Sequence, residues 1–92
     1  MNKAEFINYI VSKHDCSKTE AQRIIDIFTD SVINNLGEGN EINFVGFGRF
    51  YTNRVEAKTG RNPKTGATIS IPAFTQPRFS AGQKLKDACN KE

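Results

Sequence analysis

The sequence is poor in the residues that build catalytic and metal sites. Its 92 residues include one histidine and two cysteines, Cys16 and Cys89, which lie far apart. His14 is close to Cys16, but a zinc site needs further ligands at short spacing, and the sequence offers none. Acidic residues are scattered, and no glycine-rich phosphate loop leads into a helix. We therefore expect no metal, no cofactor and no enzymatic activity.

Long apolar runs are also absent. No stretch approaches the roughly 18 residues that a membrane span requires, so no membrane partner is expected. Residues 1–15 contain no long apolar run and no small-residue cleavage pattern, which argues against a secretory signal. Two distant cysteines without a secretory context fit reduced thiols. These features predict a cytoplasmic protein.

Acidic residues are scarce in the second half of the chain. Residues 1–48 carry four Lys or Arg against seven Asp or Glu, a net charge of −3. Residues 49–86 carry eight Lys or Arg against a single acid, Glu56, a net charge of +7. The remaining six residues contribute −1, which gives +3 for the whole chain. This asymmetry favours nucleic acid as a partner over a merely solvated cationic face.

The middle of the chain has little to bury. Its sizeable apolar side chains between residues 52 and 73 are Val55, Ile69 and Ile71. Asn62-Pro63 followed by Gly66 predicts a tight turn, because proline presets φ and glycine tolerates positive φ. The flanks, 52–59 and 68–73, carry β-branched residues at intervals and predict strands. We expect a two-stranded ribbon that projects from a body and has its tip at about residues 60–66. An isolated ribbon is marginal in water, so we expect a partner to order it.

Two helices are expected before the ribbon. Asn2 caps the first, over residues 2–14, and Ser17-Lys18-Thr19-Glu20 opens the second with a capping box. Apolar residues at spacings of three and four continue to Leu36, and Gly37 ends the helix. The two helices form a hairpin whose apolar surface is wider than one short neighbouring helix would cover.

Strands surround the ribbon at its base. Residues 41–45 alternate like a strand, and Gly46-Phe47-Gly48 forces a tight connection that needs unusual φ or close approach. The next strand begins at Arg49, and the return strand ends near Phe79. Pro72 and Pro77 are acceptable only at edge positions. Ser80-Ala81-Gly82-Gln83 is interpreted as the start of a short C-terminal helix over about 80–90.

The expected element order is therefore α-α-β-β-β-α. It describes one α+β domain over residues 1–92, with a three-stranded antiparallel sheet and a protruding two-stranded β-ribbon arm. Residues 1–48 would form a mainly helical dimerisation body, residues 49–79 the sheet and arm, and residues 80–92 the C-terminal helix.

Aromatic residues are numerous for so short a chain. Seven of the 92 residues are phenylalanine, and a chain of this length buries only a modest core by itself. We expect a core shared between two chains. Its predicted members are Phe28, Val32, Phe44, Phe47, Phe50 and Phe79.

Taken together, these segments resemble the bacterial histone-like HU and integration host factor family, and HU more than integration host factor. The resemblance extends along essentially the whole chain. It rests on Met1-Asn2-Lys3, Ser17-Lys18-Thr19-Glu20-Ala21, Gly46-Phe47-Gly48-Arg49-Phe50, Gly60-Arg61-Asn62-Pro63-Lys64-Thr65-Gly66, Ile71-Pro72 and Gly82-Gln83-Lys84-Leu85-Lys86-Asp87-Ala88. The glycine–Phe turn and the Arg-Asn-Pro tip are highly specific only in combination.

The resemblance implies an intertwined homodimer, or a heterodimer with a paralogue, whose two arms wrap double-stranded DNA in the minor groove. It implies that Pro63 is a wedge between base pairs, with Arg61 and Asn62 beside it in the groove. A rigid apolar wedge suits unstacking, and arginine suits the narrow minor groove. The other implied DNA contacts, mostly to phosphates, are Lys3, Arg54, Lys58, Lys64, Arg78, Lys84 and Lys86.

Two positions depart from the family pattern. Position 55 is valine where many relatives have arginine, and adjacent Arg54 points to the opposite face of a strand. Position 83 is glutamine where lysine is common. Both changes predict weaker phosphate contacts or a shifted DNA path.

The function implied is DNA binding largely without sequence specificity. Such a protein would bend and compact the DNA of the nucleoid and would prefer bent, nicked or gapped duplex. The alternative within the family is a sequence-specific bender like integration host factor, which reads DNA deformability. A further alternative is a protein-interaction module that binds a basic partner through the acidic helices.

Overall fold

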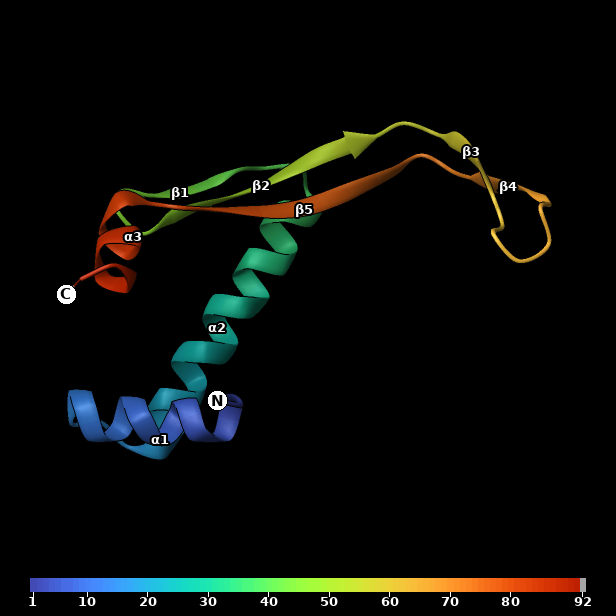
Figure 1. Cartoon of the computed structure of the whole chain (residues 1–92). Coiled ribbons are helices and arrows are strands. Elements are labelled where there is room, and N and C mark those ends of the chain that lie inside the picture. Colours follow the sequence, from blue (N-terminus) through green and yellow to red (C-terminus); the bar gives the residue numbers. More distant parts are fainter. Residues whose placement is uncertain (92) are drawn as a thin grey trace. The chain divides into compact units, whose positions relative to one another are not determined.

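The computed structural model describes residues 1–91. The chain forms two compact units, Met1–Asn34 and Asn35–Glu92 (Figure 1). The elements in chain order are α1 (Lys3–His14), α2 (Lys18–Gly37), β1 (Ile42–Phe44), β2 (Gly48–Val55), β3 (Lys58–Arg61), β4 (Thr68–Ile71), β5 (Phe74–Ala81) and α3 (Gln83–Cys89).

The first unit is the predicted helical hairpin. The Asn2 side chain accepts a hydrogen bond from the Glu5 backbone N–H at 2.9 Å and starts α1, and the helix ends at Asp15 in the left-handed conformation with φ of 53°. The Ser17 hydroxyl accepts from the Glu20 N–H at 3.1 Å and starts α2. Both predicted N-terminal caps are therefore confirmed, and each satisfies a backbone donor that the helix itself cannot.

The second unit is built on an antiparallel sheet in the order β1-β2-β5. The long pairing runs from Gly48 opposite Ala81 to Val55 opposite Phe74. Pro77 lies in β5, which is an edge strand, as predicted for a residue without an N–H group.

The register gives this sheet two different faces. Residues directly opposite share a face, and neighbours along a strand alternate. The aromatic face carries Ile42, Phe44, Phe50 and Phe79. The basic face carries Asn43, Arg49, Tyr51, Asn53, Gln76, Arg78 and Ser80. The separation holds at the β1 end of the sheet, whereas near the arm Val55 and Phe74 lie on the basic side and Arg54 on the aromatic side.

The arm is a separate two-stranded sheet, β3 with β4 (Figure 1). Val55 pairs with Phe74, and Lys58 pairs with Ile71, so the register continues from one sheet into the next. The ladder is interrupted in between, where Pro72 has no N–H to donate. The expected pair of unbroken strands is therefore divided, and the observed order contains five strands rather than three.

Backbone hydrogen bonds connect the glycine–Phe turn, Gly46-Phe47-Gly48, to the start of α3. Gly46 has φ of +85°, and the Phe47 N–H donates to the Phe44 carbonyl at 2.9 Å. The Gly82 N–H donates to the Phe47 carbonyl at 2.7 Å, and the Leu85 N–H to the Gly46 carbonyl at 3.2 Å. The predicted close backbone approach at this turn is confirmed.

The start of the C-terminal helix was predicted wrongly. Ser80 and Ala81 belong to β5, where they pair with Arg49 and Gly48, and α3 begins only at Gln83. The cap position is Gly82, which makes no side-chain cap hydrogen bond. The Ser80 hydroxyl suggested a local cap, but pairing with β2 determines the conformation at this position.

Candidate nucleic-acid interface

The tip of the arm is closed by backbone and side-chain hydrogen bonds. The Asn62 N–H donates to the Ala67 carbonyl at 2.9 Å, and the Gly66 N–H donates to the Asn62 carbonyl at 2.7 Å. The Asn62 side-chain oxygen accepts from the Lys64 N–H at 2.9 Å. Gly66 has φ of +72°, as the turn prediction required. Pro63, which is exposed, follows Asn62 directly and so lies inside the closed turn.

The Asn62 side chain stabilises the turn itself. Its side chain is predicted to lie in the DNA groove, but in the chain alone its oxygen orders the turn around Pro63. Gly60 and Arg61 are the last two residues of β3, so the turn begins at Asn62. The apex therefore consists of Asn62 to Ala67, with Pro63 and Lys64 both exposed.

The two cations of β3 lie on opposite sides of the arm. Lys58 is opposite Ile71 and shares its side with Ile69, whereas Arg61 is opposite Thr68 and shares its side with Thr59. One side of the arm is thus partly apolar, and the other combines a guanidinium with hydroxyl groups. The two sides of the arm therefore differ in chemistry.

The predicted sheet cations are also divided between faces. Arg78 lies on the basic face, opposite Tyr51. Arg54 is opposite Thr75, on the same side as the aromatic face, and its Nη1 donates to the Thr75 hydroxyl at 3.2 Å. The expectation that Arg54 cannot replace an arginine at position 55 is consistent with this register, because Val55 lies on the other side of the strand.

The basic face holds a functional candidate that sequence reasoning missed. Arg49 counted toward the positive charge of the second half, but not toward the site. Its guanidinium carbon lies 4.2 Å from the centroid of the Tyr51 ring, and its Nη1 donates to Glu41 Oε1 at 3.1 Å. The alternation of residues 49 and 51 along a strand was the available signal.

The lysines of α3 are exposed at the end of the sheet. Lys84 lies against the glycine turn, since its Cβ would be 3.4 Å from a Cβ built on Gly46. Lys86 is exposed in the last turn of the helix. Gln83, which stands where lysine was expected, donates from its amide to Asp87 Oδ1 at 2.7 Å. The amide therefore has a partner inside α3.

Lys3 lies in the helical unit. Its ammonium nitrogen is 2.6 Å from Asp26 Oδ1, and both side chains are about half exposed. The pair joins α1 to α2 across the hairpin. An exposed pair of this kind contributes less than about 1 kcal/mol, so it does not prevent Lys3 from contacting another anion.

The predicted dimer-core residues divide into two groups of incompletely covered side chains. The Phe79 ring centroid lies 4.8 Å from that of Phe50 and 5.8 Å from that of Phe47, which in turn lies 6.3 Å from Phe44. Phe44, Phe47 and Phe79 nevertheless remain 41%, 45% and 43% exposed. A single chain therefore leaves the aromatic face without a full cover.

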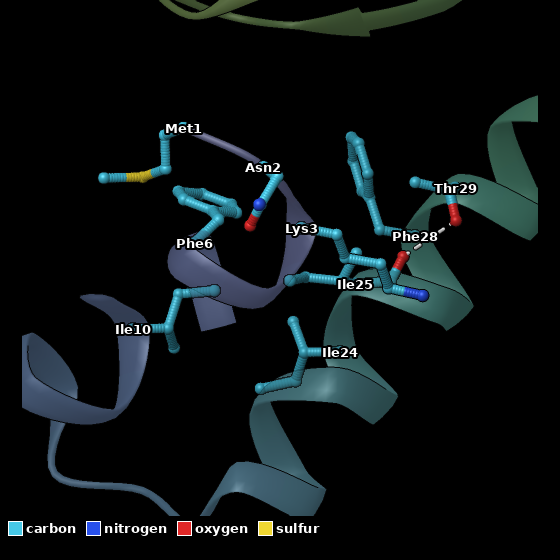
Figure 2. Close-up of a pocket in the computed structure, with 9 residues that line it drawn as sticks. All are labelled: Met1, Asn2, Lys3, Phe6, Ile10, Ile24, Ile25, Phe28 and Thr29. Atoms are coloured by element: carbon cyan, nitrogen blue, oxygen red, sulfur yellow. Dashed lines mark hydrogen bonds between the residues drawn. The ribbon is translucent and has the colours of Figure 1, made fainter. Parts of the chain in front are cut away.

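A second apolar surface lies in the helical unit. Phe6 and Ile10 of α1 face Ile24, Ile25 and Phe28 of α2 across an open groove of about 720 Å³ (Figure 2). Phe28 is 41% exposed, and Val32 is half-buried. Only Ile7 and Ala21 are buried apolar residues among the residues described. This unit also lacks an enclosed core of its own.

Two other kinds of site are absent from residues 1–91. No group of three or more His, Cys, Asp or Glu side chains in this range could hold a metal ion. No helix in this range has the length and apolarity to cross a membrane.

The fold and the site together define a class of protein: a small α+β protein with a basic sheet face and a basic β-arm. Residues 1–90 match the family model described as "Bacterial DNA-binding protein". The chain belongs to this bacterial DNA-binding protein family, the family of the histone-like HU proteins. The resemblance found in the sequence is thereby confirmed.

Individual relatives agree with this assignment. The chain is 47% identical over 88 residues to DNA-binding protein HU-alpha of Vibrio proteolyticus, covering 96% of this chain and 98% of the relative. It is 43% identical over 99 residues to DNA-binding protein HU of Rickettsia typhi, covering 98% and 100%. Its fold matches HU of Anabaena, solved in a cocrystal with DNA, with a TM-score of 0.89, 32% identity and complete coverage of both chains.

Proposed function

We propose that this protein is a histone-like architectural protein that binds double-stranded DNA largely without sequence specificity, and bends and compacts it in the cytoplasmic nucleoid. The observation that carries the proposal is the arm: a basic ribbon that presents an exposed proline at a closed turn. Family membership and the DNA cocrystal of the Anabaena relative support it.

The arm acts in the minor groove. Pro63 is the wedge, because its ring is rigid and apolar and loses little conformational freedom when it enters a base step. Arg61 lies on the hydroxyl-bearing side of the arm and contacts the electronegative groove. Lys58 and Lys64 bind phosphates as point charges and carry no sequence information.

The body completes the DNA path with further cations. Arg78 contributes from the basic face, and Lys84 and Lys86 contribute from α3. Lys3 and Arg54 now contact Asp26 and Thr75, and DNA phosphates replace these partners when DNA binds. These cations are assigned to phosphates, which carry no sequence information, and this favours non-specific binding.

The working form is a dimer, with a second copy of the chain or a paralogue. The half-exposed rings of the aromatic face and of Phe28 are the surfaces that a partner chain covers. Burying apolar area contributes about 25 cal/mol per Å², so leaving these rings in water would be unfavourable for so small a protein. Two chains place two arms on one DNA duplex.

The test is a competition assay between intact and nicked duplexes of matched sequence. A bender prefers nicked DNA, because a broken strand is easier to kink. We expect Pro63→Ala to lose most of this preference while it still binds intact duplex. Pro72→Ala, a proline at the break in the arm, is the matched control and should keep the preference.

Each result decides a different point. A wild type that does not distinguish nicked from intact duplex would refute the wedge. An affinity that barely changes between about 50 and 200 mM salt would refute phosphate-driven binding altogether, because counterion release makes such binding salt-dependent. Weak competition by random DNA would instead identify a sequence-specific bender of the integration host factor type.

A further inference from the structure

The basic face carries a charged cluster of which the proposed DNA contacts include only Arg78. Arg49 and Tyr51 are alternate residues of β2, and Glu41 immediately precedes β1. Asn43 of β1 is opposite Arg49, and the Glu41 carboxylate contacts the Arg49 guanidinium at 3.1 Å. Arg78 is opposite Tyr51 from the other neighbouring strand. The cluster therefore contains residues of β2 and β5 and the residue that precedes β1.

Arg49 is held in a defined position within this cluster. Its guanidinium lies over the Tyr51 ring at 4.2 Å, within the range of an attractive cation–π contact. A stacked planar guanidinium has fewer orientations to lose when it binds an anion. Arginine has five N–H donors, and the hydrogen bond from Arg49 to Glu41 uses Nη1. The side chain is 44% exposed, so an anion can reach it from solvent.

Glu41 places a carboxylate where a phosphate would bind. Its Oε1 accepts from Arg49 at 3.1 Å, and its side chain is 52% exposed. A carboxylate and a phosphate oxygen are equivalent acceptors for a guanidinium, so both compete for the same donors. An exposed ion pair is weak, and a DNA phosphate can displace it.

We propose that Arg49 is a further phosphate-contacting residue of the basic face, oriented by Tyr51, and that Glu41 competes with DNA for it. This inference rests on the proposed DNA-binding function and adds an internal competitor to it. Two cations of the same face then behave differently: Arg78 donates to the neutral Gln76 amide oxygen at 3.5 Å, whereas Arg49 must first leave the Glu41 carboxylate. The protein therefore binds DNA less tightly than it would without the Glu41 carboxylate.

The experiment measures binding of a short duplex by fluorescence anisotropy over a series of salt concentrations. We expect Glu41→Gln to tighten binding about two- to fivefold, the range that an exposed ion pair accounts for. It should also steepen the dependence of log K on log salt by up to about 0.9, the contribution of one added phosphate contact. Arg49→Gln in the Glu41→Gln protein should abolish both gains.

Removing any acid raises affinity somewhat, so a charge-matched control is needed. Glu38→Gln changes the net charge equally in the same unit, and Glu38 accepts at 3.5 Å from Asn40 rather than from a cation. The proposal is overturned if Glu41→Gln gains no more than Glu38→Gln, or if its gain survives in the Arg49→Gln background. Loss of salt-dependent binding by the wild type would instead refute the proposed function itself.

Discussion

Replacing Gly82 by alanine tests how α3 is attached to the sheet. A Cβ at this position would lie 2.5 Å from the carbonyl carbon and oxygen of Gly46 and 2.9 Å from the carbonyl carbon of Phe47. These atoms belong to backbone and cannot rotate away like the end of a side chain. Either the turn or the start of α3 must therefore move by about 1 Å to reach ordinary contact distance.

The shift weakens two hydrogen bonds across this contact. They are Gly82 N–H to Phe47 carbonyl and Leu85 N–H to Gly46 carbonyl, at 2.7 and 3.2 Å. Weakening each bond by about half costs about 1 kcal/mol in total, since a hydrogen bond contributes about 1 kcal/mol, and overpacking adds about 1–3 kcal/mol. We expect Gly82→Ala to lower the free energy of unfolding by about 2–4 kcal/mol.

The assay is urea unfolding followed by circular dichroism, at two protein concentrations because dimerisation adds to apparent stability. For a urea m-value of about 1–3 kcal/mol/M, the midpoint should fall by at least about 0.7 M. Gly37→Ala is the matched control: no atom lies within 4 Å of a Cβ built there, so stability should be unchanged or slightly higher. A Gly82→Ala protein as stable as wild type would refute the reasoning.

Three further results are expected. Phe47→Ala should cost about 3–5 kcal/mol of folding or dimerisation free energy in urea titrations, because its ring packs between two others; an equally stable variant would show that the ring is outside the shared core. Asp26→Asn should change the free energy of unfolding, measured by thermal denaturation, by less than about 1 kcal/mol, because the pair of Asp26 with Lys3 is exposed. A larger loss would mean that the pair is buried in the dimer. Arg78→Gln should reduce the salt dependence of DNA binding more than Arg54→Gln, because only Arg78 lies on the basic face; equal losses would contradict this assignment of faces.

The structure also changes how the predicted site should be interpreted. Arg54 and Arg78 were grouped by charge, but the register places them on opposite faces of one sheet. Asn62 was assigned to the DNA groove, yet its side chain first closes the turn. Arg49 was not assigned to the site, although it shares a face with Arg78. Composition and spacing along the chain contain no information about such pairings.

The sequence by itself determined the local features. The caps at Asn2 and Ser17 and the turn around Pro63 depend on residues only a few positions apart, so their side-chain chemistry is sufficient to predict them. The asymmetric charge and the family motifs are likewise readable from the chain. These signals predicted the helical hairpin, the basic arm and the family.

The tertiary structure decided what depends on partners distant in sequence. Ser80 and Ala81 became strand because β2 pairs with them, although their local sequence suggested a helix start. The faces of Arg49 and Arg54 follow from the register, in which a shift of one residue would exchange the two faces. Local chemistry sets the conformation of a turn or a cap, but only long-range pairing determines which side chains share a surface.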